Sequence, residues 1–141
     1  MNENCICIDV RTAAHKLTQT YDQVLAPSGL TVTQFSQMNL IRSLDAPTLT
    51  DLAAASDLER STLGRNLKVL EKMGMVTMKV GRDARSKTIH LSRKGMNAFK
   101  KAAPLWYSAQ TELAERLGLA GRAQLEDLLS ALTEPLVLNQ N

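Results

Sequence analysis

Hydrophobic residues recur at the spacing of an α-helix along most of the chain. The first predicted helix covers residues 8–26, and its apolar face consists of Val10, Ala14, Leu17, Tyr21 and Val24. A second helix is predicted to follow Thr31, because Thr31 and Gln34 form a pair that caps a helix start. Two more helices are predicted, at 49–55 after the similar pair Thr48 and Asp51 and at 60–73 before Gly74.

The hydrophobic pattern changes after Gly74. Residues 75–80 and 87–91 have the composition of two strands, and the polar stretch between them predicts the turn of a β-hairpin. Ser92 is predicted to cap a long helix that reaches residue 117, with a kink at Pro104. Gly118 and Gly121 then precede a last helix at 122–138. The order α-α-α-α-β-β-α-α predicts a mainly α, single domain over residues 1–141.

Residues 49–74 contain a short helix, a tight break and a second helix, as in a helix-turn-helix. The residues expected to pack the two helices together are Leu52, Ala53, Leu58, Leu63, Leu67 and Leu70. The other face of the second helix is polar and is expected to contact DNA, through Arg60, Ser61, Thr62, Arg65, Asn66 and Lys68. Arginine and asparagine form bidentate contacts with guanine and adenine in the major groove, and a helix start favours phosphate.

The predicted hairpin tip is also basic. Arg82, Arg85 and Lys87 lie on or beside one loop, and Asp83 is the acid expected to hold Arg85 through a salt bridge. An arginine presented by such a loop suits the narrow, electronegative minor groove of DNA.

Charge is distributed unevenly along the chain. The net charge of +3 combines −4 over residues 1–59, +10 over residues 60–101 and −3 over residues 102–141. A basic central third between two acidic segments favours a polyanionic partner. A merely solvated basic surface is the alternative reading of this charge.

The run from Leu49 to Gly95 resembles the MarR family, through the helix-turn-helix, the phrase LEKMGMV, the Asp-x-Arg wing and LSRKG. The resemblance implies a winged helix-turn-helix at 32–95 and dimerisation helices at 8–26 and 96–138. It further implies a homodimer on a pseudo-palindromic DNA operator, with Arg85 in the minor groove. An effector of the aromatic acid type is expected by the same resemblance, and no cofactor. The apolar faces of the first and last helices also lack a covering element, which a partner subunit would supply.

Cys5 and Cys7 are the two cysteines of the chain. They are read as ordinary thiols, as a redox sensor ahead of the first helix, or as metal or metalloid ligands together with His15. Two aromatic residues, Trp106 and Tyr107, either pack in the core or line a ligand pocket.

No phosphate-binding loop, zinc motif or nucleophile elbow is present, so an enzyme is not expected. The start of the chain lacks the pattern of a signal peptide and no apolar run reaches bilayer length, so a cytoplasmic protein without a membrane partner is expected. The favoured function is transcriptional regulation, most simply repression. The alternative is a winged-helix sensor or protein-interaction module that responds to oxidant or metalloid through Cys5 and Cys7.

Overall fold

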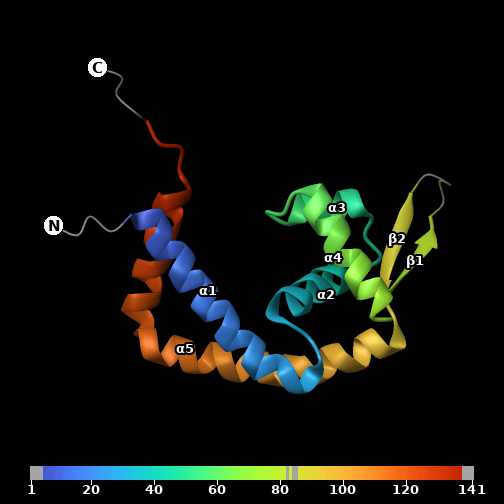
Figure 1. The fold of residues 1–141 in the computed structure, drawn as a ribbon, viewed down its shortest axis with the longest axis horizontal. Coiled ribbons are helices and arrows are strands. Elements are labelled where there is room, and N and C mark those ends of the chain that lie inside the picture. Colours follow the sequence, from blue (N-terminus) through green and yellow to red (C-terminus); the bar gives the residue numbers. More distant parts are fainter. Residues whose placement is uncertain (1–4, 82, 84–85, 138–141) are drawn as a thin grey trace. The chain divides into compact units, whose positions relative to one another are not determined.

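The computed structural model describes residues 5–81, 83 and 86–137 and is mainly helical, with one two-stranded sheet (Figure 1). The elements in chain order are α1 (Ile6–Leu25), the 3-10 helix η1 (Ala26–Ser28), α2 (Val32–Leu44), α3 (Leu49–Ala55), α4 (Arg60–Lys72), β1 (Val76–Val80), β2 (Lys87–Leu91) and α5 (Arg93–Thr133). This order confirms the predicted winged helix-turn-helix. The chain divides into two compact units, one ending at Trp106 and one beginning at Tyr107.

Both predicted capping pairs are present at the starts of α2 and α3. The backbone N–H of Gln34 donates to the Thr31 hydroxyl at 3.2 Å, and the N–H of Thr31 donates to the Gln34 side chain at 3.0 Å. Thr48 donates its backbone N–H and its hydroxyl to the Asp51 carboxylate, each at 2.8 Å. These two bonds favour the charged carboxylate and lower the pKa of Asp51. Each pair satisfies N–H groups that a helix start leaves without partners.

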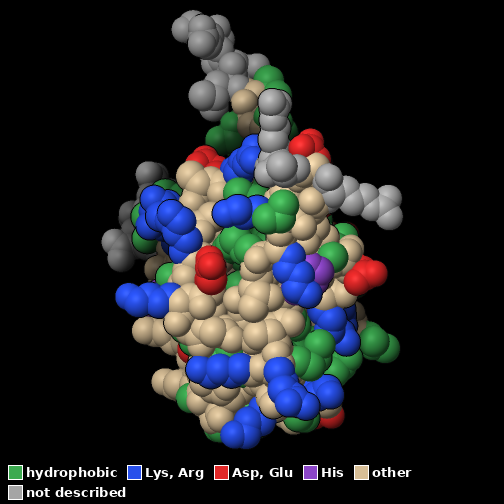
Figure 2. All heavy atoms as spheres, turned by 90° about the vertical axis from the view of Figure 1, so that its right-hand side faces the viewer, with side chains coloured by type: hydrophobic (Ala, Val, Ile, Leu, Met, Phe, Trp, Pro, Cys, Tyr) green, Lys and Arg blue, Asp and Glu red, His purple; other side chains and the backbone are tan. Residues whose placement is uncertain are grey.

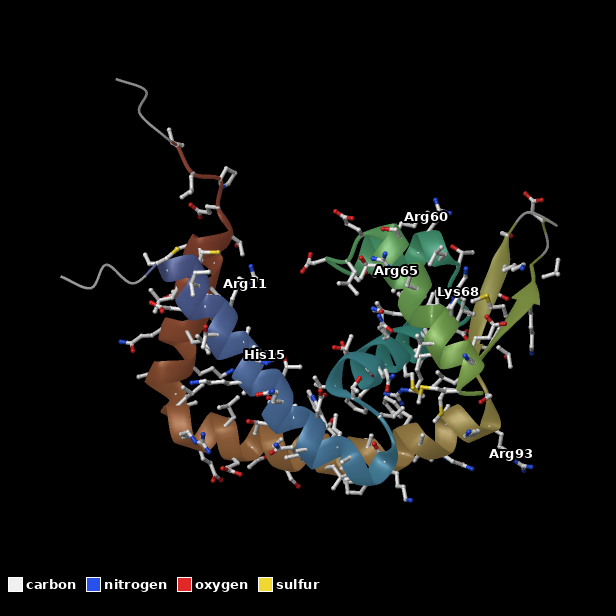
Figure 3. All side chains as sticks on the ribbon, viewed as in Figure 1. Arg11, His15, Arg60, Arg65, Lys68 and Arg93 are labelled. Atoms are coloured by element: carbon white, nitrogen blue, oxygen red, sulfur yellow. The ribbon has the colours of Figure 1, made fainter. Side chains whose placement is uncertain are left out.

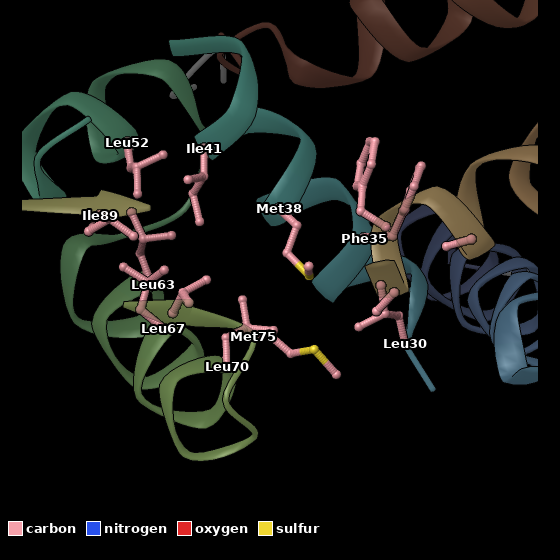
Figure 4. Packing of buried hydrophobic residues seen from close by; sticks show 14 of the residues in the cluster. Leu30, Phe35, Met38, Ile41, Leu52, Leu63, Leu67, Leu70, Met75 and Ile89 are labelled. Atoms are coloured by element: carbon pink, nitrogen blue, oxygen red, sulfur yellow. The ribbon is translucent and has the colours of Figure 1, made fainter. Parts of the chain in front are cut away.

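The core of the first unit joins α2, α3, α4 and the hairpin (Figure 4). Leu63, Leu67 and Leu70 of α4 face Leu52 of α3 and Ile89 of β2 in this cluster, and all five are at most 2% exposed. Leu58, which was expected to join this packing, is 37% exposed because it lies in the turn before α4.

A stack of aromatic rings connects α2 to α5. The rings of Phe35 and Phe99 are stacked with centroids 4.9 Å apart, and Trp106 tilts against Phe35 at 5.7 Å. The guanidinium of Arg42 lies 4.7 Å from the centre of the Phe99 ring. Such pairs contribute about 0.5–1.5 kcal/mol beyond their buried area, so they hold the first half of α5 against α2.

The hairpin pairs β1 with β2 in antiparallel register, from Val76 with Leu91 to Val80 with Lys87. The middle of β2 is joined to the segment before α3, because the N–H of Ile89 donates to the Pro47 carbonyl at 2.8 Å. The hairpin is therefore fixed to the helix-turn-helix.

The start of α5 packs very closely on the start of the hairpin. Ser92 accepts a hydrogen bond from the N–H of Gly95 at 2.9 Å, which confirms it as the predicted cap. The N–H of Ser92 also donates to the Met75 carbonyl at 2.9 Å. A Cβ atom on Gly95 would collide with that carbonyl. Ser92 and Gly95 of the LSRKG run therefore allow the hairpin to pack closely against the start of α5.

The terminal helices differ from the predicted boundaries. Helix α1 begins at Ile6 rather than residue 8, because Cys5 has the extended backbone of a cap residue. The last helical segment ends at Thr133, since Pro135 disfavours helical backbone in the residue before it. Residue 138, the expected end, lies outside the described residues.

Helix α5 keeps helical backbone angles at Pro104, where a kink was expected, and departs from them at Gly118 (φ 68°, ψ 171°). Glycine adopts a positive φ without steric cost, so Gly118 divides α5 into the two helical segments that were predicted. Within the described part of the chain, no helix combines the length and the hydrophobicity that crossing a bilayer requires.

The close packing at Gly95 gives the first prediction. Gly95→Ala should lower the free energy of unfolding by about 1–3 kcal/mol, because the added methyl group forces the Met75 carbonyl away. Urea denaturation followed by circular dichroism measures the change. The matched control is Gly64→Ala in α4, where an added Cβ meets no atom within 4 Å. That variant should gain up to about 1 kcal/mol, and equal stability of the two variants would contradict the packing argument.

Candidate nucleic-acid interface

Helix α4 has one buried face, which fixes the direction of its other side chains. Leu63, Leu67 and Leu70 recur at intervals of four and three residues, and each is at most 1% exposed. Because an α-helix turns by about 100° per residue, residues at this spacing occupy one side of it. The residues between them must lie at the flanks or on the outward side.

The outward side of α4 is polar and basic. Ser61, Arg65, Lys68 and Lys72 follow one another at intervals of four, three and four residues, and all four are exposed. Figure 3 shows Arg65 and Lys68 on this helix, with Arg60 near its start. Lys72 was not among the expected contacts, although its spacing from Lys68 places it in the same row. The outward side is therefore a continuous row of hydroxyl and cationic groups.

Thr62 and Asn66 lie at the flank of α4 and are half-buried. The Thr62 hydroxyl accepts a long hydrogen bond of 3.4 Å from the Arg65 guanidinium. Asn66 borders a hollow of about 170 Å³ together with Thr31 and Thr33 near the start of α2. Of the six expected contact residues of α4, Ser61, Arg65 and Lys68 lie in the exposed row, Thr62 and Asn66 lie at the flank, and Arg60 begins the helix.

A cleft of about 400 Å³ separates α4 from the hairpin. Arg60 and Lys68 of α4 and Lys87 of β2 border it, so the structure brings together cations that lie far apart in the sequence. Thr50 at the start of α3 borders the same cleft and was not singled out in the sequence. The sequence contains no pattern that places Thr50 at this cleft, because only folding brings the start of α3 beside β2.

The hairpin tip is described in part. Gly81 donates its N–H to the Ser86 carbonyl at 2.7 Å, and Ser86 donates to the Asp83 carbonyl at 3.0 Å. Lys87 is exposed at the start of β2. Arg82 and Arg85 lie outside the described residues, and so does the expected salt bridge between Asp83 and Arg85.

Among the described residues, Arg60, Arg65, Lys68, Lys72 and Lys87 form no ion pair with an acidic side chain. The ion pairs found among the described residues join Arg116 to Glu112 and Arg122 to Glu126, both in the second unit. On the face of the molecule drawn in Figure 2, Lys and Arg side chains predominate over Asp and Glu. An excess of cations that are not paired with acids attracts anions.

Cys5 and Cys7 are exposed free thiols at the start of α1. Only Cys5 precedes the helix, as its cap residue, whereas Cys7 lies in the first helical turn. His15 is eight residues beyond Cys7 on the same helix, which corresponds to about 12 Å along the axis. Among the described residues, no three His, Cys, Asp or Glu side chains are grouped as metal ligands.

Trp106 belongs to the aromatic stack on Phe35 and packs against the core. The sequence left two roles open for Trp106, packing in the core and lining a ligand pocket. This contact favours packing in the core. Tyr107 begins the second unit and is 65% exposed.

Comparison with known proteins agrees with this geometry. The sequence model of the MarR family matches residues 30–86. The chain is similar to the transcriptional regulator MosR of M. tuberculosis in complex with DNA, with 44% identity over 92% of this chain and 96% of that chain, and a TM-score of 0.78. A second structure of M. tuberculosis MosR has 39% identity over 94% and 98% of the two chains, and a TM-score of 0.73.

More distant structures share the fold. The S. aureus MepR–DNA complex has a TM-score of 0.78 at 21% identity, covering 94% of this chain and 96% of that chain. No curated protein matches the sequence. The family match over residues 30–86, together with 44% identity to MosR along nearly the whole chain, shows that the chain belongs to the MarR family of transcriptional regulators.

Proposed function

We propose that this MarR-family regulator is a cytoplasmic repressor that binds a pseudo-palindromic operator as a homodimer and is released by a small molecule or a redox signal. Members of this family regulate transcription and are not enzymes. The observation that carries the proposal is the exposed row on α4, formed by Ser61, Arg65, Lys68 and Lys72. The similar MosR structure in complex with DNA supports double-stranded DNA as the partner.

In this proposal α4 enters the major groove. Arg65 reads a guanine, and Asn66 reads an adenine from the flank of the helix. Ser61 and Thr62 contact phosphate near the start of α4, where the cap residue Glu59 makes no side-chain hydrogen bond to the helix. Backbone N–H groups left without a side-chain cap at a helix start favour a phosphate oxygen.

The cations of the cleft and the hairpin contact the DNA backbone on either side of that groove. Arg60, Lys68 and Lys87 contact phosphates, Arg82 adds a further contact to the DNA, and Arg85 enters the minor groove. Phosphate contacts fix the position of a protein on the duplex, whereas base contacts determine sequence preference. Binding should therefore weaken steeply as salt concentration rises.

Replacing the exposed arginine of α4 tests this assignment. Arg65→Ala should weaken binding by about 1–3 kcal/mol and relax base preference at one operator position, because a bidentate contact is lost. Fluorescence anisotropy with a duplex selected by the wild-type protein from random DNA measures both effects. Arg85→Ala should weaken binding in the same assay.

The matched control for these variants is Arg116→Ala, which removes an exposed arginine of the second unit. This control should bind DNA as tightly as the wild type. If the wild-type protein selects no duplex, the alternative of a sensor or protein-interaction module gains support. If it selects one that Arg65→Ala and Arg85→Ala bind equally well, the contact surface has been misplaced.

The terminal helices support the proposed homodimer. Exposed apolar residues of α1 include Ile6, Val10 and Leu17, and those of the last helical segment include Leu125, Leu128, Leu129 and Leu132. Two helices that each present such a face to water are typical of an interface between copies of a chain. A dimer would also present two recognition helices to successive major grooves, about 34 Å apart.

A charge placed within this apolar face should prevent assembly. Leu129→Glu is expected to shift the protein from dimer to monomer and to abolish high-affinity operator binding, because a buried unpaired carboxylate is costly. Sedimentation velocity at micromolar concentration measures the change. Gln124→Glu adds the same charge at an exposed polar position of the same segment and should remain dimeric. A wild-type protein that is a folded monomer would overturn the homodimer.

The exposure of Cys5 and Cys7 supports the redox signal. Peroxide would take two electrons and two protons from two thiols, which form a disulfide as the peroxide becomes two waters. Because both cysteines lie at the start of α1, a disulfide between subunits, or one that tilts α1, would change the spacing of the two recognition helices.

Peroxide treatment of the protein–operator complex tests this signal. The wild-type protein should lose operator affinity at least about tenfold, a change of about 1.4 kcal/mol, and recover with dithiothreitol. The double variant Cys5→Ser, Cys7→Ser should bind the operator equally well and ignore peroxide. Unchanged affinity of the wild-type protein would eliminate the redox signal. Loss of affinity on adding metal ions, absent in the double variant, would favour the metalloid reading instead.

A further inference from the structure

We infer that a basic stripe on the first part of α5 binds a second DNA duplex while α4 holds the operator, so that the regulator bridges two segments of DNA. The inference rests on the proposed binding of an operator by α4. The stripe lies within the first unit, and its exposed residues are Arg93, Lys94, Asn97, Lys100 and Lys101.

The packing of α5 directs the stripe to one side of the helix. The buried residues of this part of α5 are Gly95, Ala98, Phe99 and Ala102. Because an α-helix turns by about 100° per residue, the stripe residues share an arc of roughly 120° on the other side of it. From Arg93 to Lys101 the stripe extends about 12 Å along the helix axis. It is therefore one continuous surface rather than a set of scattered charges.

The stripe begins at the opposite end of α4 from the proposed phosphate contacts. Lys94 donates from its ammonium to the Met73 carbonyl, just beyond the end of α4, at 2.9 Å. The 13 residues of α4 separate this end from the start of the helix by about 18 Å. Figure 3 shows Arg60 at the upper end of α4 and Arg93 below its other end. A duplex seated on the start of α4 therefore leaves the stripe uncovered.

The four cations of the stripe are not paired with acids. No Asp or Glu occurs between residues 93 and 111 of the sequence. Across the part of the chain that the structure describes, the ion pairs join residues of the second unit, and none includes a residue of the stripe. In Figure 2, Lys and Arg side chains gather toward the lower edge, the side on which α5 lies in Figure 1. Such an excess of positive charge attracts a polyanion.

Two of these cations oppose the stability of the helix that carries them. Arg93 and Lys94 are in the first turn of α5, which contains no acid, although the dipole of a helix favours anions at its start. The bond to Met73 relieves part of this conflict for Lys94, and an ammonium keeps two further N–H donors. Local conflicts of this kind are most often found at functional sites. A bound phosphate backbone would remove the conflict, because it supplies the missing negative charge.

The composition of the stripe favours DNA over an acidic protein. The centre of a protein–protein interface is rich in aromatic residues and methionine and poor in lysine, whereas the stripe residues are all polar or charged. Lysine, arginine and asparagine are donors that contact phosphate oxygens without regard to sequence. Along 12 Å, one strand of a duplex presents about three or four phosphates, which matches the four cations of the stripe.

Capture of a second duplex tests the stripe. An immobilised operator duplex is saturated with the wild-type protein, and a fluorescent duplex that lacks the operator sequence is then added. The complex should retain the fluorescent duplex. The double variant Lys100→Gln, Lys101→Gln should bind the operator as tightly as the wild type but capture the second duplex at least about tenfold more weakly, because phosphate contacts are lost. Capture should also fall steeply as salt concentration rises.

The matched control is the double variant Arg116→Gln, Arg122→Gln, which removes the same charge from exposed positions of the second unit. It should capture the second duplex as the wild type does. A further measurement needs no operator. In an Arg65→Ala, Lys68→Ala background, which weakens the row on α4, neutralising Lys100 and Lys101 should lower affinity for the same fluorescent duplex at least about tenfold. The control pair should lower it much less.

Two results of the capture experiment would overturn the stripe while leaving operator binding intact. The first is a wild-type protein that occupies the operator and captures no second duplex. The second is undiminished capture by the variant of Lys100 and Lys101, which would assign the second duplex to another surface. If the wild-type protein binds no operator, the proposed function fails instead, and the measurement in the Arg65→Ala, Lys68→Ala background decides alone. Equal affinity there with and without Lys100 and Lys101 would overturn the stripe.

Discussion

The arrangement of the first unit depends on the burial of three leucines on one side of α4. Leu63, Leu67 and Leu70 are at most 1% exposed, and burying each stabilises the fold by about 1.5–3 kcal/mol. Their spacing leaves α4 a single orientation in which all three are covered. The hydroxyl and cationic residues are directed outward as a consequence, so the packing of one side of α4 determines which residues the candidate interface presents on the other side.

The elements that pack around α4 stabilise this orientation of the helix. The capped start of α3 places Leu52 against the leucines, and the hairpin places Ile89 there through its bond to the Pro47 carbonyl. Ser92 and Gly95 then fix the hairpin to α5, because only glycine admits the Met75 carbonyl so closely. The aromatic stack of Phe35 and Phe99 completes the frame. Together these contacts fix the hairpin and α5 around α4.

The same frame buries the side-chain amide of Gln37 without a hydrogen-bond partner in the protein. A glutamine in the interior of α2 costs about 1–3 kcal/mol when its amide is left without hydrogen bonds. An apolar residue of similar length would remove that cost. Gln37 is thus a local conflict with an otherwise apolar core, and such conflicts are most often found at functional sites.

Local sequence signals determined the elements of this protein. The pairs Thr31 with Gln34 and Thr48 with Asp51 act through hydrogen bonds three residues apart, so the starts of α2 and α3 could be predicted from the sequence alone. The leucine spacing of α4 likewise identified its buried side and most of its polar row. Boundaries were predicted less well where capping signals were weak, as at the start of α1.

Only the tertiary structure decided which distant residues meet. Thr50 and Lys87 border one cleft with Arg60 because the bond between Ile89 and Pro47 brings β2 beside α3. No pattern along the chain records that contact, since it joins segments about forty residues apart. The same holds for Gln37, whose sequence context is an ordinary polar position of a helix. Its burial without a partner depends on how α3 and α4 close over α2, and only the folded chain determines this.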